Sequence, residues 1–172
     1  MRYLRSAPIL LLLASCAPEP EETPYGSAAD VRAYLQEIEP YIRQVSAVQQ
    51  QVHGQVGTSG AGTGQNLSEV MDETRPLLQQ LHDDFSGVTP PPLLGPLHRD
   101  IGRLISLRLA AFDATTKGWQ LERQKGDAAL LYAEAEEKLQ EANGLSAALN
   151  DQLKDVNTAL QEFTSSQQAA SR

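Results

Sequence analysis

Apolar residues recur at helical spacing through most of this chain. After residue 27 they follow one another at steps of three and four, which predicts a first helix that begins near Ser27. Its predicted buried stripe is Val31, Leu35, Ile38, Ile42, Val45, Val48 and Val52. Pro40 removes one backbone hydrogen bond inside this run. Because the pattern keeps its phase on both sides of the proline, we expect a kink rather than a break.

The same spacing predicts two further helices. The second is expected to start at Asn66, where Asn-Leu-Ser-Glu resembles a capping box, and to end near Ser86, with Pro76 inside it. A rigid turn at residues 89–92 leads into the third, which Gly126 is expected to close. The predicted buried faces are Leu67, Val70, Thr74, Leu77, Leu81, Phe85 and Val88, and then Leu94, Leu97, Ile101, Ile105, Leu109, Phe112, Thr116 and Trp119.

The fourth predicted helix has the most regular pattern in the chain. After a candidate cap at Asp127, its apolar positions alternate steps of three and four over more than four heptads. They are Tyr132, Ala135, Leu139, Ala142, Ser146, Leu149, Leu153, Val156, Leu160 and Phe163. The fold class that we predict is all-α, an up-and-down bundle of about four long helices with heptad-like packing, spanning residues 27–165.

Two segments lie outside this periodicity. Residues 54–65 contain five glycines and are predicted to form a flexible loop. They lack the Gly-Lys-Ser/Thr ending and the preceding strand of a phosphate-binding loop, so nucleotide binding is not expected there. Residues 166–172 are predicted to be a disordered tail.

The amino terminus carries the only cysteine of the chain. Arg2 and Arg5 precede an apolar run over residues 7–13, which ends in Leu13-Ala14-Ser15-Cys16. This arrangement resembles a bacterial lipoprotein signal. The resemblance implies that residues 1–15 are a signal peptide and that Cys16 becomes the new amino terminus, with acyl chains such as palmitate as its membrane anchor. The alternative is an ordinary secretory signal with a chance cysteine near its cleavage site.

The anchor and the residues after it predict a location. Residues 16–26 contain three prolines and three glutamates, which predicts a stiff tether that reaches roughly 30 Å. Ala17 follows the cysteine, where an aspartate is associated with retention in the inner membrane. We therefore expect a protein lipid-anchored in the cell envelope, at the periplasmic face of the outer membrane if the host has two membranes.

Charge narrows the choice of partners. The chain has 14 basic and 22 acidic residues, a net charge of −8, and loss of the two signal arginines would bring this to −10. Phosphate binding relies on lysine and arginine, so no nucleic-acid partner is expected. Residues 94–125 carry six basic and three acidic side chains, whereas residues 127–163 carry eight acidic and two basic. The third and fourth helices are therefore expected to pair favourably.

The sequence contains no pattern typical of a catalytic or cofactor site. Its only thiol is the predicted lipid site, and no serine lies in a nucleophile elbow. The Cys-x-x-Cys-His motif of attached haem is missing, as is the Glu-x-x-His motif of carboxylate-bridged iron. We therefore expect neither an enzyme nor a cofactor.

Two weaker patterns suggest binding sites on the bundle. One is a low-affinity divalent metal site at the turn between the second and third helices, formed by His82, Asp84, His98 and Asp100. The favoured interpretation is that both histidines lie at the rim and donate to turn carbonyls. The other is an anion or acidic-partner surface formed by Arg99, Arg103 and Arg108, although acidic side chains of the fourth helix are expected to neutralise these arginines.

Together these features favour a membrane-anchored envelope lipoprotein that acts as a non-enzymatic helical binding or scaffold module. Its expected partners are the membrane, through the lipid on Cys16, and another protein or a second copy of itself. The alternative is a periplasmic carrier or sensor that holds a small ligand or metal within the bundle. A polar-lined cavity would favour the carrier, and a closely packed interior the scaffold. The turn at residues 89–92 with its early histidine, His98, is also similar to helical exported bacterial proteins without assigned function.

Overall fold

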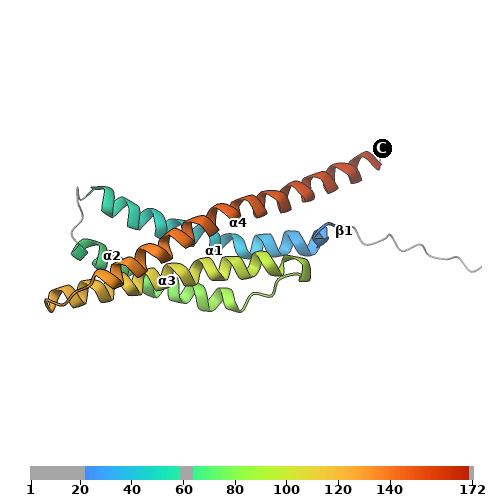
Figure 1. Ribbon diagram of the computed structural model, residues 1–172. Helices are drawn as coiled ribbons and strands as arrows, with labels where there is room; N and C mark the ends of the chain where they lie inside the picture. The colour runs from blue at the N-terminus through green and yellow to red at the C-terminus, as the bar shows by residue number, and fades with distance from the viewer. Residues whose placement is uncertain (1–21, 59–63, 171–172) are drawn as a thin grey trace, which may run out of the picture.

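The computed structural model describes residues 22–58 and 64–170 and confirms the all-α bundle. In this part of the chain the helices are α1 (Ala28–Thr58), α2 (Gly64–Ser86), the 3₁₀ helix η1 (Pro92–Leu94), α3 (Gly95–Arg123) and α4 (Ala129–Ala170). Consecutive long helices pack on one another, so their order along the chain is also their order in space (Figure 1). α1 and α4, the first and last helices, touch only briefly.

α3 is the central helix of the bundle. It packs against α2 on one side and α4 on the other, and so it buries more than one face. Leu97, Ile101, Ile105 and Phe112 are buried as predicted. A single stripe does not predict the second buried face, which includes Leu104, Leu107, Ala111 and Ala114. Trp119, predicted to lie in the core, is only half-buried.

The buried face of α2 differs from the prediction by one position. Met71 and Leu78 are fully buried, whereas Leu77, predicted to be buried, is 45% exposed. With Thr74, Leu81 and Phe85, which are buried as predicted, they form a row with strictly alternating steps of three and four. If Leu77 were buried instead of Leu78, the row would contain two successive steps of four residues, from Leu77 to Leu81 and on to Phe85. Because the two leucines are adjacent, the sequence allows either to face the core, and the packing of the helices selects Leu78.

Both internal prolines lie within continuous helices. Pro40 is inside α1 and Pro76 inside α2, so neither breaks its helix. Figure 1 shows the axis of α1 changing direction along its course. The glycine-rich loop is also shorter than predicted, because α1 continues to Thr58 and α2 begins at Gly64 rather than Asn66. Glycine lowers helix stability by about 1 kcal/mol without forbidding a helix.

A small hairpin replaces the last part of the predicted tether. β1 (Glu22–Thr23) pairs antiparallel with β2 (Gly26–Ser27). The Thr23 hydroxyl donates to the Gly26 carbonyl at 2.9 Å and accepts from the Tyr25 N–H at 3.1 Å. Gly26 has a φ of 104°, a conformation that favours glycine. The prediction of a tether over residues 16–26 is therefore wrong for residues 22–26, because local hydrogen bonds fold this segment against the bundle.

A left-handed residue ends α3. Lys125 has a φ of 60°, and its N–H donates to the Glu122 carbonyl at 2.8 Å. The Gly126 N–H donates to the Leu121 carbonyl at 2.9 Å, which completes a Schellman motif. Lys125 thus occupies the position that glycine usually takes. A Cβ on Gly126 would lie 2.5 Å from Leu121 Cδ1, so a larger residue here would require Leu121 to shift.

α4 is the longest helix, with 42 residues. Asp127 caps its start as predicted, because Asp127 Oδ1 accepts from the Ala129 N–H at 3.0 Å. The predicted heptad seam is confirmed by a buried row at seven-residue spacing: Ala135, Ala142, Leu149 and Val156. The predicted disordered tail is wrong for residues 166–170, which continue the helix. Figure 1 shows this end projecting beyond the other helices.

Candidate functional site

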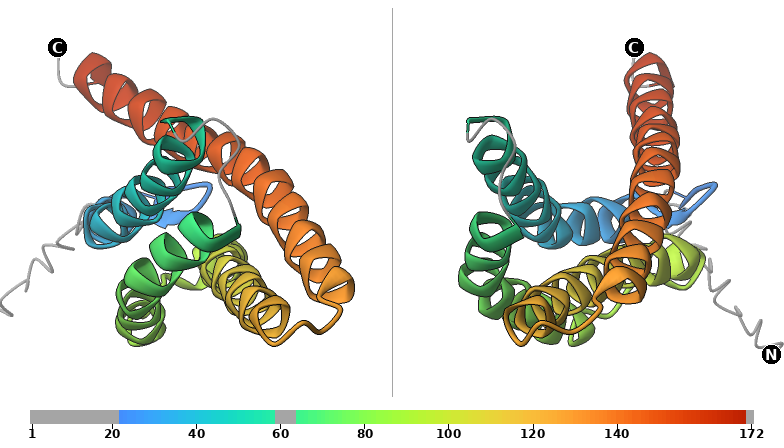
Figure 2. Two further views of the ribbon diagram at one scale, coloured as in Figure 1. Left: turned by 90° about the vertical axis from the view of Figure 1, so that its left-hand side faces the viewer. Right: turned by 60° about the vertical axis from the view of Figure 1, so that its left-hand side comes forward.

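α4 crosses α1 instead of packing along it. Figure 2 shows the two helices diverging on either side of their crossing. Three adjoining cavities lie between residues 35–52 of α1 and residues 139–157 of α4, and each shares lining residues with its neighbour. We call this region the α1–α4 seam, formed by residues 35–52 of α1 and 139–157 of α4 together with the side chains of α2 and α3 beneath them. α1 and α4 contact each other much less than consecutive long helices do.

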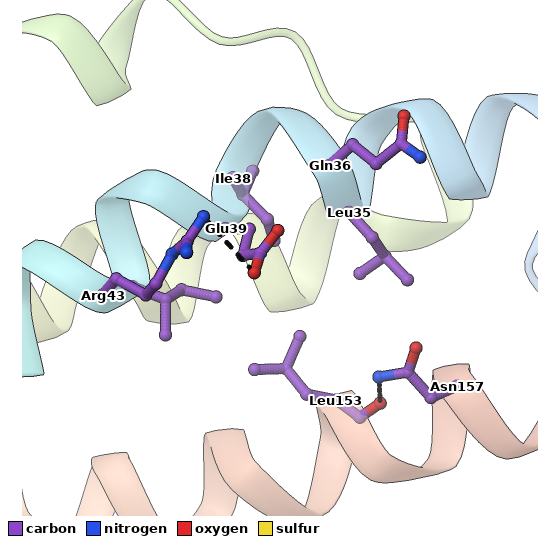
Figure 3. A pocket seen from close by; sticks show the side chains of 8 residues that line it. Leu35, Gln36, Ile38, Glu39, Arg43, Leu153 and Asn157 are labelled. Carbon is purple, nitrogen blue, oxygen red and sulfur yellow. Dashed lines mark hydrogen bonds and ion pairs between the residues drawn. The ribbon is translucent and has the colours of Figure 1, made fainter.

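The largest of these three cavities is an open groove of about 400 Å³ (Figure 3). Leu35 and Ile42 of α1 lie seven residues apart and are half-buried, as is Leu153 of α4. Figure 3 shows Leu35 and Leu153 facing each other across the groove. The polar side chains that line it are Gln36, Glu39, Arg43 and Asn157, of which Arg43 and Glu39 form an ion pair at 3.4 Å. The groove therefore has apolar walls and a polar rim.

Asparagines at seven-residue spacing line the seam on the α4 side. Asn157 lines the open groove, Asn150 a middle cavity of about 40 Å³, and Asn143 an inner cavity of about 80 Å³. Seven residues are close to two helical turns, so the three amides form one row along α4. Thr164 extends the row, and Arg32 of α1 donates to its hydroxyl at 2.9 Å. This row is visible in the sequence, but a search for apolar spacing does not reveal it.

The inner cavity contains a buried arginine from α3. Arg108 is 3% exposed, and its Nη2 donates to Gln49 Oε1 of α1 at 2.7 Å. The Arg108 Nε has no hydrogen-bond partner. Burial lowers the pKa of Arg108, yet a guanidinium keeps its charge in proteins. No ion pair joins Arg108 to a carboxylate among the described residues, so the buried cation is incompletely satisfied.

The predicted basic face of α3 does not form one surface. Arg99 and Arg103 are exposed, whereas Arg108 is buried. Nine residues separate Arg99 from Arg108, which is two and a half helical turns, so the two side chains point in opposite directions. The prediction of an exposed surface formed by all three arginines is therefore wrong. Arg103 forms an ion pair with Glu141 of α4. For this arginine, the prediction that an acidic side chain of the fourth helix neutralises its charge is confirmed.

The four candidate metal ligands, His82, Asp84, His98 and Asp100, do not come together. Among the described residues, no group of three or more His, Cys, Asp or Glu is placed to hold a metal ion. The His82 ring lies 3.4 Å from the Asp83 carboxylate, and Asp100 accepts a hydrogen bond from α4 at 3.3 Å. The proline turn brings the ends of α2 and α3 together without directing these side chains at a common point.

His98 instead joins three helices. Its Nδ1 is hydrogen-bonded to the hydroxyl of Tyr34 of α1 at 3.1 Å, and its ring stacks on Phe85 of α2 with centroids 4.4 Å apart. Burial lowers the pKa of His98 and raises that of Tyr34. The expectation that this histidine donates to a turn carbonyl is wrong. Tyr34 lies three residues after Val31 and four before Ile38, so it fits helical spacing, but it was not included in the predicted stripe.

The predicted lipid site, Cys16, and the signal peptide at residues 1–15 lie outside the described residues. Within the described ranges, no helix combines the length and apolar character needed to cross a membrane. Comparisons with protein-family models, curated proteins and solved structures found no match.

Proposed function

We propose that this protein is a lipid-anchored envelope protein and a non-enzymatic helical binding module, whose α1–α4 seam takes an amphipathic helix of a protein partner. The observation that carries this proposal is the open groove of about 400 Å³ between half-buried apolar side chains of α1 and α4. The anchor rests on the resemblance of Leu13-Ala14-Ser15-Cys16 to a lipoprotein signal.

The spacing of the groove residues supports a helical occupant. Leu35 and Ile42 are seven residues apart on α1, and Asn150 and Asn157 are seven residues apart on α4. A helix laid between two helices presents its own side chains at the same repeat, so apolar and amide contacts recur in register. Amides both donate and accept hydrogen bonds, so the row on α4 suits polar side chains at the edge of a partner's apolar face.

The chemistry of the rim also supports binding rather than a reaction. Glu39 and Arg43 pair with each other across one helical turn, and Asn157 donates to the Leu153 carbonyl at 2.9 Å. Hydrocarbon walls and amides supply contact area and hydrogen bonds, which are the usual components of a recognition groove.

Site-specific photo-crosslinking in cells tests the proposal. A benzophenone amino acid at position 157 faces the groove, whereas one at position 155 lies two residues away, on nearly the opposite side of α4. We expect a protein adduct from position 157 that is absent or much weaker from position 155. Leu35→Glu, which places a charge on the apolar wall, is expected to reduce the adduct at least fivefold while the far-ultraviolet circular dichroism stays unchanged.

Three outcomes would count against this function. Equal adducts from positions 157 and 155 would mean that the groove is not the contact surface. An adduct containing a second copy of this chain would replace the partner with self-association. No adduct from either position, with the protein shown to be folded and anchored, would remove the basis for a protein partner.

The anchor needs its own experiment. In cells that process lipoproteins, we expect the wild-type chain in the membrane fraction with a mass shift on the peptide that begins at Cys16. Cys16→Ala is expected to remove the mass shift and release the protein from that fraction. A wild-type chain that is cleaved elsewhere and carries no lipid would refute the anchor without affecting the groove.

A further inference from the structure

We propose that the inner end of the α1–α4 seam is a binding site for an alkyl carboxylate, with the carboxylate on Arg108 and the alkyl chain along the seam. This inference goes beyond the proposed partner helix and does not depend on it. It corresponds to the carrier alternative, because it places a small ligand within the bundle.

The first support is the unbalanced charge of Arg108. Moving a cation into a protein interior is costly unless a partner compensates it, and an arginine cannot avoid the cost by losing its proton. Gln49 supplies one neutral acceptor, and the Nε–H remains without one. Arg108 lines the inner cavity, so a carboxylate bound there would neutralise the guanidinium, and guanidinium and carboxylate are matched in geometry.

The second support is the shape and lining of the inner cavity. Its volume of about 80 Å³ suits a carboxylate better than a bulky headgroup. Gln49 and Asn143 are placed beside Arg108 as further polar contacts. The remaining walls are apolar: Val48, Val52, Met71, Phe112 and Leu139. One charged group surrounded by hydrocarbon is the arrangement expected for a ligand with one anionic end.

The third support is a series of adjoining cavities that leads away from Arg108. Gln49 lines both the inner and the middle cavity, and Ile42 and Leu153 line both the middle cavity and the open groove. The middle cavity has the smallest volume of the three, about 40 Å³. Apolar side chains, among them Val45, Leu104 and Leu149, form most of its wall, and Ser46, Ser146 and Asn150 add polar atoms. An extended alkyl chain fits a narrow path more readily than a branched ligand does. α1 and α4 make few backbone contacts with each other, so side chains rather than tightly packed backbones define the width of this part of the seam.

Calorimetric titration of the full chain carrying Cys16→Ser tests the site without detergent. The probes are dodecanoate, below its micelle concentration, and the neutral dodecanol. We expect one dodecanoate per chain, bound at least tenfold more tightly than dodecanol. Arg108→Met is expected to weaken dodecanoate binding at least tenfold and leave dodecanol binding unchanged. Arg103→Met, the same substitution at an exposed position of α3, is the matched control and is expected to change dodecanoate affinity less than twofold.

A second variant keeps the experiment decisive if Arg108→Met does not fold. Ser146 lines the middle cavity, so Ser146→Leu is expected to obstruct the chain path and weaken dodecanoate binding at least fivefold with Arg108 intact. The absence of saturable dodecanoate binding to the folded chain would overturn the inference. Equal binding of dodecanoate and dodecanol, or unchanged dodecanoate binding by folded Arg108→Met, would also overturn it. These results would not affect the crosslinking test, which detects a protein at the outer groove.

Discussion

α4 forms two very different interfaces with its neighbours. Against α3 it packs closely, with the small residues Ala135 and Ala142 buried. Against α1 it leaves a groove, with Leu153 half-buried and asparagines along the edge. Both interfaces use the same seven-residue repeat. The difference shows that side-chain size and polarity, not periodicity, decide which seam of a bundle closes and which stays open.

The closed interface is tightest near the start of α4. A Cβ on Gly118 of α3 would lie 2.7 Å from the Tyr132 ring, so this glycine lets the ring pack against the α3 backbone. The Tyr132 hydroxyl donates to Glu122 at 2.8 Å. Burial, and then the Glu122 carboxylate, raise the pKa of Tyr132 to about 12.

The largest expected contrast is between two leucines of α4. Leu149 is 4% exposed and packs in the core, so Leu149→Ala is expected to lower the free energy of unfolding by about 2–5 kcal/mol. Leu153 faces the groove and is only half-buried, so Leu153→Ala is expected to cost less than about 1.5 kcal/mol. Urea unfolding followed by circular dichroism measures both. Equal losses would mean that the α1–α4 seam is closed in solution.

Two glycines provide the next test. Gly118→Ala is expected to destabilise the protein by about 1–3 kcal/mol, because the added methyl group overlaps the Tyr132 ring. Gly144→Ala is the matched control on α4, where a Cβ meets no atom within 4 Å. It is expected to stabilise the helix by about 0.5–1 kcal/mol. If both variants gain stability, the close approach of α3 and α4 is not present in solution.

The same two interfaces show how far sequence predicts structure. The heptad row of α4, the Asp127 cap and the all-α class follow from local spacing and are confirmed. Leu77 and Leu78 are adjacent, so local spacing permits either to be buried and only packing against other helices selects Leu78. The folding of residues 22–26 depends on the Thr23 hydroxyl and the φ of Gly26, which proline content did not indicate.

The candidate site was harder to predict than the fold. Arg108 was assigned to a surface with other arginines, because charge favours exposure in the absence of other information. In the fold Arg108 is buried and donates to Gln49, which is 59 residues away along the chain. The asparagine row was accessible from sequence, since Asn143, Asn150 and Asn157 repeat every seven residues. Only the position of α1 in the structure shows that these asparagines line a seam, because polar residues at the same spacing on an isolated helix would simply face solvent.

The turn between α3 and α4 holds the closed interface in place and offers a smaller test. The left-handed conformation of Lys125 costs a non-glycine residue roughly 1–2 kcal/mol. Glycine relieves this strain, but its greater freedom in the unfolded chain lowers the free energy of unfolding by about 0.4–1 kcal/mol. Lys125→Gly is therefore expected to raise the free energy of unfolding by about 0.5–1 kcal/mol in total. Thermal unfolding should show a higher midpoint. A lower midpoint would contradict the left-handed geometry at this turn.

The smallest expected effect concerns the contact between His98 of α3 and Tyr34 of α1. His98 of α3 is hydrogen-bonded to Tyr34 of α1, and burial lowers its pKa below the ordinary value of 6.5. Between the two pKa values the unfolded chain binds more protons than the folded chain, so this stabilisation is complete above about pH 6.5 and declines as pH falls. Asp113, whose pKa is lowered by its hydrogen bond from Arg75, contributes a similar loss only below about pH 3.8.

Urea unfolding between pH 7.5 and pH 5 isolates the histidine. The wild-type chain is expected to lose stability across this range, and His98→Asn, whose amide can still bond the Tyr34 hydroxyl, is expected to lose less. The two proteins are compared by the slope of the free energy of unfolding against pH, not by its absolute value, because the variant also loses the stacking on Phe85 and is less stable at every pH. Parallel slopes for the two proteins would show that His98 does not stay neutral between α1 and α2.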